Sequence, residues 1–466
     1  MNGPAQAAAA VWDDLVEQGA ALAAGHITSV ELTRATLARI EQLNPVLNCY
    51  LHVDAAGALE AAAAADARRL AGRPLGPLDG LALAVKDNID VAGMPTTAGM
   101  ATRRGRIAVA DAFTVAGLRA AGAVILGKLN MHEGALGATN RNPHYGDCHN
   151  PHRLGYTPGG SSGGSACAVA AGMAAAALGS DTMGSVRIPA SYCGVSGHKP
   201  SRGLVSTGGS VACSYRLDTI GPLARSARDL ALLMDVLAQF DPACPEARAS
   251  WPAAGPAPQT LLAPSDLAAL GVDAALAACF ERQLEVFAGL GLRILRAPFA
   301  DYDFGAARRA GLLSCEGDML LEHAEDRAAQ PDAFSPELRA MLDFAAGKDL
   351  ASLTRANRTI DRAALRSHAW FDMADMVALP TTPQTAFPFT APVPANQADL
   401  TSIANMAGLP ALSVPMPVAQ GVLPAGLQLV GPHGADRTVL ALGQRYQQAC
   451  GHVFARPAPE ALQAGS

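Results

Sequence analysis

Residues 159–200 of the chain read GGSSGGSACAVAAGMAAAALGSDTMGSVRIPASYCGVSGHKP. Two serine clusters stand in this stretch, GGSSGG at 159–164 and SDTMGS at 180–185. Glycines beside a serine allow the backbone to turn sharply and leave N–H groups free to face a ligand. The stretch therefore predicts two tight turns that present serine hydroxyls, and the other segments are interpreted around them.

The second cluster ends in Ser185, which directly precedes a short helix-compatible run at 186–192. A similar run at 165–171 follows the first cluster. Unpaired N–H groups and the helix dipole favour negative charge at a helix N-terminus. A serine in that place suits a reaction that builds an oxyanion beside its hydroxyl.

Upstream, five apolar residues at 81–85 (LALAV) predict a buried strand, and Lys86 follows them directly. Ligands usually bind at the strand ends of such sheets. The 35 basic residues include only four lysines, namely Lys86, Lys128, Lys199 and Lys348. Because a buried lysine can lose its proton whereas arginine effectively cannot, Lys86 is a candidate general base. The alternative is a lysine that reaches solvent from the strand end or pairs with an aspartate such as Asp87.

The whole Gly/Ser-rich stretch resembles the amidase signature family of serine amidohydrolases, and further landmarks follow in the family order over most of the chain. The resemblance implies a triad in which Lys86 is the base, Ser161 is the bridging serine and Ser185 is the nucleophile. It also implies that the peptide bond before Ser161 is cis. The spacing from Ser161 to Ser185 is the one that the family requires. An amide would then be cleaved through an acyl-enzyme, and no cofactor is expected.

The same resemblance assigns the oxyanion hole to backbone N–H groups of one turn, those of Thr182, Met183, Gly184 and Ser185. Asp181 and Arg187 also match the signature, and we expect them to brace this turn without taking part in the chemistry. Met183 stands where glycine is usual in the family. If the turn needs a left-handed backbone there, methionine would cost roughly 1–2 kcal/mol. Its side chain is expected near the acyl pocket, so a relative's substrate is not transferred.

Three other patterns would indicate different chemistry. Residues 159–163 satisfy the G-x-S-x-G pattern of α/β-hydrolases, but no apolar strand leads directly into them and no downstream Asp-then-His pair completes a triad. The glycine-rich loop also lacks the Gly-Lys-Ser/Thr ending of a phosphate-binding loop. A zinc site is suggested by four closely spaced ligand types whose spacing matches no common metal motif: His144, Cys148, His149 and His152. The sequence therefore predicts no metal.

Bulk properties limit the classes of function. The formal net charge is −6 and no basic block occurs, so nucleic acid is not expected as a direct partner. The N-terminal residues lack the basic region of a signal peptide, and no apolar run reaches the roughly 20 residues that span a bilayer. The nine cysteines form no CxxC pairs and indicate no disulfide framework. We therefore expect a cytoplasmic protein with no membrane contact.

A strand at 81–85, a helix at 111–122 and a strand at 123–126 follow one another and predict an α/β fold. We expect a single large domain over 1–466, with a mixed, mostly parallel twisted sheet covered by helices on both faces. Its expected parts are a helical N-terminal segment, the core that carries the serines, a variable helical region that shapes substrate access, and a C-terminal sheet and helix part, at about 1–70, 80–230, 240–370 and 371–466.

Hydrolysis of a carbon–nitrogen amide bond in a small molecule is thus the expected function, and few charges in the core suggest a small or uncharged amide. Two alternatives remain open. One is the glutaminase-type A subunit of a tRNA-dependent amidotransferase, which would need a second protein as its partner. The other is a non-catalytic binding protein on the same scaffold, which would not need Lys86, Ser161 and Ser185 together. The resemblance leaves a homodimer open.

Overall fold

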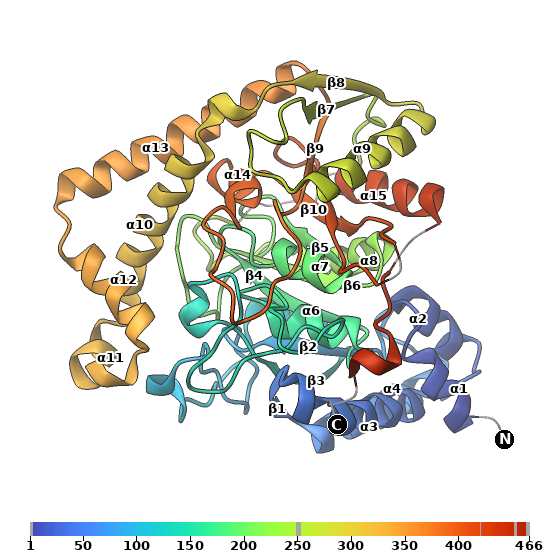
Figure 1. The fold of residues 1–466 in the computed structure, drawn as a ribbon. Coiled ribbons are helices and arrows are strands. Elements are labelled where there is room, and N and C mark those ends of the chain that lie inside the picture. The colour runs from blue at the N-terminus through green and yellow to red at the C-terminus, as the bar shows by residue number, and fades with distance from the viewer. Residues whose placement is uncertain (1–2, 248–252, 420, 452–453, 463–466) are drawn as a thin grey trace.

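The computed structural model describes residues 3–247, 253–419, 421–451 and 454–462 of the chain. Within these residues, eleven strands form one sheet in the order β1-β3-β2-β4-β6-β5-β10-β11-β9-β7-β8 (Figure 1). The strands are β1 (Tyr50–Val53), β2 (Ala82–Lys86), β3 (Val124–Leu129), β4 (Ala176–Asp181), β5 (Ser196–Lys199), β6 (Thr219–Ala224), β7 (Thr260–Pro264), β8 (Arg293–Ala297), β9 (Met376–Pro380), β10 (Ala411–Pro415) and β11 (Gly426–Val430).

The sheet is mixed, as expected, but the expectation that it is mostly parallel is wrong. Parallel pairing joins β2 to β3 and β4, and β7 to β8 and β9. The other six neighbouring pairs among the described strands are antiparallel. Parallel neighbours need a crossover connection, usually a helix. The strand–helix–strand pattern at 81–126 supplies one, whereas β10 and β11 follow each other without an intervening helix and pair antiparallel.

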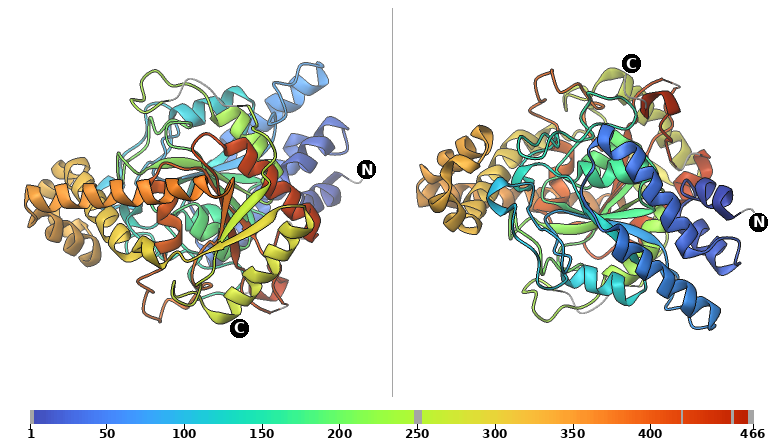
Figure 2. Two further views of the ribbon diagram at one scale, coloured as in Figure 1. Left: turned by 90° about the horizontal axis from the view of Figure 1, so that it is seen from above. Right: turned by 90° about the horizontal axis from the view of Figure 1, so that it is seen from below.

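Helices surround the sheet. They are α1 (Gly3–Ala10), α2 (Leu15–Ala23), α3 (Ser29–Leu47), α4 (Ala55–Leu70), α5 (Phe113–Ala120), α6 (Gly163–Ala170), α7 (Arg187–Cys193), α8 (Ala227–Leu237), α9 (Ala274–Gly289), α10 (Phe304–Glu322), α11 (Ala324–Ala329), α12 (Pro336–Ala346), α13 (Leu350–His368), α14 (Asp399–Met406) and α15 (Asp436–Cys450). Helices α10 to α13 extend to one side of the molecule, opposite the N-terminal helices (Figures 1 and 2). Short 3₁₀ helices occupy Ala101–Arg103, Glu133–Ala135, Ala300–Tyr302, Pro331–Ala333, Ala369–Asp372 and Pro459–Leu462.

Strand β2 shows how the apolar run at 81–85 places Lys86. Successive side chains of a strand point to opposite faces of the sheet. Leu83 and Val85 accordingly join a hydrophobic core that also contains residues of α5 and α8. Ala82 and Ala84 join a second core with residues of α4 and α6. Because both faces of β2 are covered, the strand delivers Lys86 into the interior of the protein.

The region expected to be helical, at about 240–370, also contains two strands that the sequence analysis did not predict, β7 and β8. β8 pairs with β7 at the edge of the sheet, and α9 connects the two in a β–α–β unit. The side chains of β8 do not alternate between buried and exposed, since two of the five are exposed and three are half-buried. An edge strand of this kind lacks the apolar run by which buried strands are recognised. Among the described helices, none combines the length and the apolarity that crossing a membrane requires.

Candidate active site

Lys86 ends β2 with its side chain fully buried. Its Nζ lies 2.7 Å from Ser161 Oγ and 2.8 Å from Ser180 Oγ, and the Ser180 carbonyl oxygen is 3.4 Å away. In the part of the chain that the structure describes, no carboxylate forms an ion pair with this amine. The structure thus brings Lys86 and Ser161 together as the sequence predicts. It adds Ser180, which belongs to the second serine cluster but received no role from the sequence.

The surroundings of Lys86 favour the neutral form of its amine. Burial lowers the pKa of Lys86 to about 7, because an apolar environment disfavours the charged amine. The negative charges of Asp218 and, to a smaller extent, Asp181 oppose this effect and raise the pKa. A lysine with this pKa is neutral in a large fraction of molecules near pH 7, so it can accept a proton from a neighbouring hydroxyl.

The two serine turns are joined through their backbones. The Gly160–Ser161 peptide bond is cis. Gly160 is tightly enclosed, since a Cβ atom there would lie 2.8 Å from the backbone nitrogen of Asn140. The next residue, Ser162, donates its N–H to the carbonyl oxygen of Ser185 at 3.1 Å. This bond fixes the turn that carries Ser161 against the turn that carries Ser185.

Ser185 lies between β4 and α7 and lines a cavity, with 8% of its surface exposed. Helix α7 begins at Arg187, and its N-cap is Val186 without a side-chain hydrogen bond. Ser185 therefore stands one residue before the N-cap, close to the helix N-terminus that the sequence predicts. Ser161 is fully buried behind it. This arrangement gives Ser185, rather than Ser161, access to a bound molecule.

The turn at 182–185 offers fewer free N–H groups than the sequence suggested. The N–H of Gly184 donates to the Asp181 carboxylate at 2.7 Å, so in this structure it is not free to hold an oxyanion. For the N–H groups of Thr182, Met183 and Ser185, no acceptor is found among the described residues. Gly184 instead serves the geometry of the turn. Its φ is 129°, and a Cβ atom there would lie 2.2 Å from Thr401 Oγ1.

Met183 fits the turn without backbone strain. Its φ angle is not positive, so the free-energy cost of a left-handed methionine does not arise. Its carbonyl oxygen accepts a hydrogen bond from Thr401 Oγ1 at 2.7 Å. The Met183 side chain lines the same cavity as Ser185 and packs near Gly311 of α10 and Met406 of α14. The predicted position of this side chain beside the acyl pocket is therefore consistent with the cavity.

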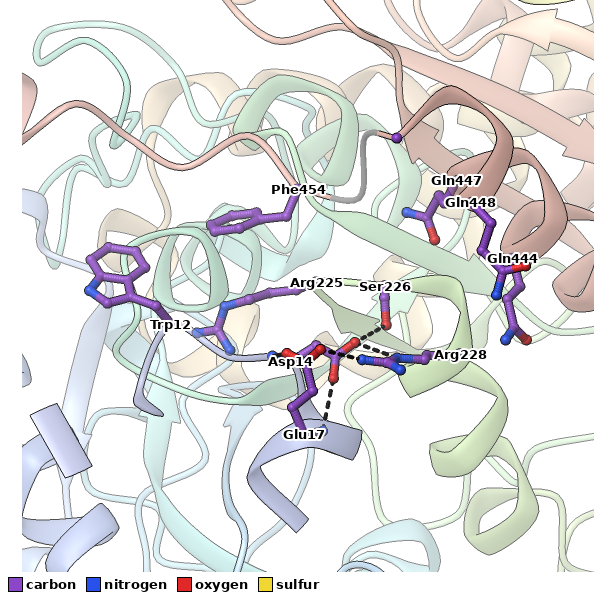
Figure 3. Close-up of a pocket in the computed structure, with 11 residues that line it drawn as sticks. Trp12, Asp14, Glu17, Arg225, Ser226, Arg228, Gln444, Gln447, Gln448 and Phe454 are labelled. Atoms are coloured by element: carbon purple, nitrogen blue, oxygen red, sulfur yellow. Dashed lines mark hydrogen bonds and ion pairs between the residues drawn. The ribbon is translucent and has the colours of Figure 1, made fainter. Parts of the chain in front are cut away.

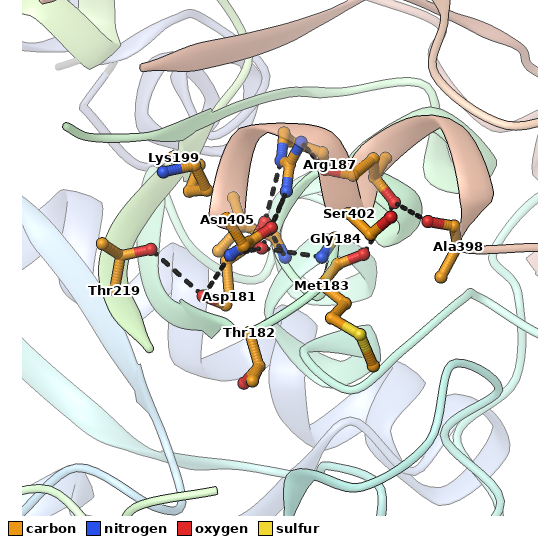
Figure 4. A network of polar contacts seen from close by, with 12 residues as sticks. Asp181, Thr182, Met183, Gly184, Arg187, Lys199, Thr219, Ala398, Ser402 and Asn405 are labelled. Atoms are coloured by element: carbon orange, nitrogen blue, oxygen red, sulfur yellow. Dashed lines mark hydrogen bonds and ion pairs between the residues drawn. The ribbon is translucent and has the colours of Figure 1, made fainter. Parts of the chain in front are cut away.

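Asp181 and Arg187 form a buried pair beneath the turn (Figure 4). Two hydrogen bonds join them, at 3.0 Å from Nε and 2.9 Å from Nη2 of the guanidinium. The remaining contacts of the pair come from the C-terminal part: Arg187 donates to the Thr401 carbonyl, Gln428 and Asn405, and Asn405 donates to Asp181. Burial alone would raise the pKa of Asp181, but the guanidinium and these hydrogen bonds hold it well below its usual range.

Because Asp181 also binds the N–H groups of Gly184 and Val186, the pair fixes the backbone that leads into and out of Ser185. Figure 4 shows the Met183 side chain pointing away from this pair. Asp181 thus contacts the turn directly, with Arg187 bound to it, and the bracing role of the pair stays a prediction.

The cavity at Ser185 has a volume of about 210 Å³. Its wall is mainly apolar. The apolar side chains come from the turn, from the residues after η2 (Glu133–Ala135), from α7, from α10 and from the loop before α14: Leu136, Met183, Ile188, Leu312, Val393 and Pro394. Polar groups in the wall include Thr182, Arg308 and Gln397. Arg308 and Gln397 lie more than 100 residues from the serine clusters in sequence, and no local motif marks either one.

Asp218 is a further residue that the sequence did not single out. It accepts hydrogen bonds from Thr182 Oγ1 at 2.6 Å and from the N–H groups of Cys213 and Ser214 at 2.9 and 3.1 Å. Burial raises the pKa of Asp218 to about 6, although these donors and Lys86 lower it. The only sequence signal was an acidic residue in a polar, glycine-containing loop. Asp218 thus contacts the 182–185 turn through Thr182 and also influences the charge of Lys86.

The histidines considered for zinc have separate partners. His144 Nε2 lies 2.8 Å from Glu133, His149 Nδ1 accepts from the Gly155 N–H at 3.1 Å, and His152 Nε2 lies 2.9 Å from the Cys193 carbonyl oxygen. Among the described residues, no three His, Cys, Asp or Glu side chains are grouped as metal ligands. The polar contacts of these histidines therefore serve the loop in which they lie.

A larger cavity, of about 480 Å³, lies elsewhere, between the N-terminal segment, α8 and α15 (Figure 3). Its charged side chains all make hydrogen bonds within the protein. Arg228 binds Asp14 at 2.6 Å and Glu17 at 2.8 Å, and Arg225 donates to the Asp13 and Ala174 carbonyl oxygens. We assign the chemistry to the smaller cavity, because that one contains Ser185 with a buried lysine behind it.

Comparison with known proteins identifies the family of the chain. A family model described as Amidase matches residues 31–440. The chain is 38% identical to the A subunit of glutamyl-tRNA(Gln) amidotransferase from Chloroflexus aurantiacus, over 92% of this chain and 95% of the relative.

Two solved structures show how the fold compares. One comes from a study described as an unexpected vestigial protein complex that reveals the evolutionary origins of an s-triazine catabolic enzyme. It has a TM-score of 0.87 and 31% identity over 96% of this chain and 100% of that chain. The other is the A subunit of glutamyl-tRNA(Gln) amidotransferase from Thermotoga maritima, with a TM-score of 0.76 and 28% identity over 90% and 91% of the two chains. Because the Amidase family model spans most of the sequence, the chain belongs to the amidase signature family.

Proposed function

We propose that the protein hydrolyses a carbon–nitrogen amide bond through an acyl-enzyme on Ser185, with Lys86 as the base and Ser161 as the bridging serine. The observation that carries this proposal is the buried amine of Lys86, hydrogen-bonded to Ser161 at 2.7 Å and without a carboxylate partner among the described residues. Burial alone does not mark a base, because Lys199 is also buried without an ion pair among the described residues. The amine of Lys199 donates to the Pro200 carbonyl oxygen, which has no proton to give. The amine of Lys86 instead meets the hydroxyls of Ser161 and Ser180, from which it can accept a proton.

The reaction begins with two proton transfers. Neutral Lys86 Nζ takes the proton of the Ser161 hydroxyl, and Ser161 Oγ takes the proton of the Ser185 hydroxyl. Ser185 Oγ then forms a bond to the substrate carbonyl carbon, and the carbonyl π electrons move to oxygen. The free N–H groups of Met183 and Ser185, and that of Thr182 if the substrate reaches it, stabilise the oxyanion. Gly184 is left out of this set because Asp181 accepts its N–H.

Collapse of the tetrahedral intermediate breaks the C–N bond. Ser161 delivers a proton to the leaving nitrogen and recovers one from the Lys86 ammonium. The side chain of Lys86 is then neutral again. Water then attacks the ester carbonyl with the same groups as relay, so its proton reaches Ser185 Oγ and the acid is released. The role of Asp181 and Arg187 is to hold the backbone of the turn through both steps, as their hydrogen bonds to Gly184 and Val186 suggest.

A second candidate function is hydrolysis of glutamine within an amidotransferase complex. The name of the Chloroflexus aurantiacus relative, matched over nearly its whole length, favours this candidate over a free-standing amidase. The fold comparison favours it less, since the TM-score to the Thermotoga maritima protein is 0.76 against 0.87 for the other structure. Both candidates use the same chemistry on Ser185, and they differ in the acyl group and in the need for a partner.

The experiment is a release assay for ammonia or amine, with glutamine, asparagine and a series of aliphatic and aromatic amides. Wild type is compared with Ser185→Ala and with Ser265→Ala, an exposed serine outside the site. Loss of turnover in Ser185→Ala alone supports the proposal. Turnover of glutamine only, and only after addition of a co-purified partner protein, would move the second candidate ahead. Full turnover by Ser185→Ala would overturn both.

A further inference from the structure

The cavity at Ser185 has one charged wall group. Among the described residues that line it, Arg308 of α10 is the only one with a charged side chain, and most of the others are apolar. The Arg308 side chain is 18% exposed. A charge held in so apolar a cavity is costly unless a partner compensates it. An uncharged substrate would displace water from this guanidinium without replacing the lost hydrogen bonds by a charged partner.

Asp399 forms an ion pair with Arg308 and compensates its charge, but it uses only part of the hydrogen-bond donors of the guanidinium. Its Nε donates to Asp399 Oδ1 of α14 at 2.6 Å. For its two terminal Nη groups, no acceptor is found among the described residues. Burial raises the pKa of Asp399, and Arg308 lowers it through the hydrogen bond and its charge. Asp399 therefore binds the guanidinium through Nε and leaves the two terminal Nη groups unoccupied by the described residues. Two such N–H donors on one planar group can bind a carboxylate through two parallel hydrogen bonds.

A second polar side chain, Gln397, lies in the same wall. Gln397 is 3% exposed, and its Nε2 donates to the Ala138 carbonyl oxygen at 2.8 Å. Its Oε1 is buried with almost no surface open to the cavity, and the Tyr192 side chain interacts with the same amide. Gln397 is therefore held by the protein, whereas the Nη groups of Arg308 are the donors left for a ligand.

We propose that Arg308 binds a carboxylate on the acyl part of the substrate, so that the enzyme acts on amides that carry a second, free carboxylate. This inference rests on the proposed function, because it places the acyl group in the cavity that Ser185 lines. It replaces the expectation of an uncharged amide. The carboxylate has two sources, the distal acid of a dicarboxylic monoamide or the α-carboxylate of an amino acid such as glutamine.

The test compares glutaramate with glutaramide, in which a neutral carboxamide replaces the carboxylate at almost the same size. For wild type we expect kcat/KM to favour glutaramate by about 10²-fold or more, since a site that pairs a charged group discriminates strongly against its absence. Arg308→Met should bring this ratio close to one, mainly through KM. Arg308→Lys keeps the charge without the fork and should restore only part of the preference. Arg309→Met, at the exposed neighbouring arginine, is the matched control and should keep the wild-type ratio.

Glutamine as a substrate distinguishes an amino-acid α-carboxylate from the distal acid of a dicarboxylic monoamide. A higher kcat/KM for glutamine than for glutaramate assigns the carboxylate to an amino acid, and the reverse assigns it to a simple dicarboxylic monoamide. Equal rates on glutaramate and glutaramide in wild type, or equal losses on both in Arg308→Met, would overturn the inference while Ser185→Ala still tests the proposed function.

A binding measurement covers the case in which none of these amides is turned over. Glutarate, the product of glutaramate hydrolysis, should raise the melting temperature of wild type and of Arg309→Met, but not that of Arg308→Met. Absence of any shift in wild type at millimolar glutarate would overturn the inference without reference to catalysis.

Discussion

The Nζ atom of Lys86 lies 2.7 Å from the Oγ atom of Ser161, and neither side chain is exposed to solvent. Lys86 comes from the end of β2, and Ser161 comes from the turn before α6. A hydrogen-bonded lysine and serine in an apolar interior can exchange a proton only if the amine is neutral for part of the time. The lowered pKa of Lys86 meets this condition. The first predictions follow from this relationship.

The rate of amide hydrolysis should rise with pH through the pKa of Lys86. Burial lowers this pKa to about 7, so the base is protonated below pH 7 and neutral above it. For a neutral substrate, kcat/KM should therefore increase about tenfold per pH unit below 7 and level off above it. A pH profile from 5 to 9 measures this. A rate that stays constant down to pH 5 would speak against Lys86 as the base.

Asp218→Asn should move this acidic limb to lower pH. The negative charge of Asp218 raises the pKa of Lys86, so its removal lowers that pKa further and makes the neutral amine available at lower pH. The midpoint of the kcat/KM profile is the measured quantity. The pKa of Asp218 is itself raised to about 6, so an alternative is that Asp218 causes the limb. In that case the limb would vanish in Asp218→Asn instead of shifting.

Arg187→Met should strongly destabilise the folded protein. It leaves the Asp181 carboxylate buried without its counter-ion, and breaking a buried pair in this way costs about 3–5 kcal/mol. The control is Arg296→Met, which removes an exposed pair with Glu281 and should cost about 1 kcal/mol or less. Denaturant unfolding of both variants gives the two free energies. Similar values for both would contradict the bracing role of the Asp181–Arg187 pair.

Gly184→Ala should impair catalysis by displacing the turn that carries Ser185. The added Cβ would lie 2.2 Å from Thr401 Oγ1, at a φ of 129° that side chains rarely adopt. A shift of about 1 Å in such a turn is expected to lower kcat about 10²-fold. Gly289→Ala is the control, because a Cβ there meets no atom within 4 Å and α9 should tolerate it. An unchanged kcat in Gly184→Ala would show that the turn does not need this geometry.

Local patterns were enough to predict the parts of the site that lie at strand ends and in glycine-rich turns. An apolar run placed Lys86 at the end of a buried strand, and the two serine clusters predicted the turns of Ser161 and Ser185. The roles proposed for Lys86, Ser161 and Ser185, and for the Asp181–Arg187 pair, came from the resemblance and stay predictions. Contacts between distant segments could not be predicted in this way. Two such features are the hydrogen bond from the Gly184 N–H to Asp181 and the position of Arg308 of α10 in the cavity wall. Both depend on tertiary packing, which a local sequence pattern does not encode.

The fold shows the same division. The strand–helix–strand pattern predicted the parallel pair of β2 and β3, because the helix that connects them is visible in the sequence. The antiparallel pairing of β4 with β6, and of β5 with β10, joins strands that are not consecutive, and hydrophobic periodicity carries no signal for their direction.

Trapping the acyl-enzyme tests the central proposal most directly. Protein mixed with a good amide or ester substrate is quenched with acid within milliseconds, digested and mapped by mass spectrometry. We expect the peptide with Ser185 to gain the mass of the acyl group, Ser185→Ala to show no such gain, and Lys86→Met to accumulate far less of it than wild type does. An acyl group on Ser161, or steady turnover in Ser185→Ala, would contradict the proposed mechanism.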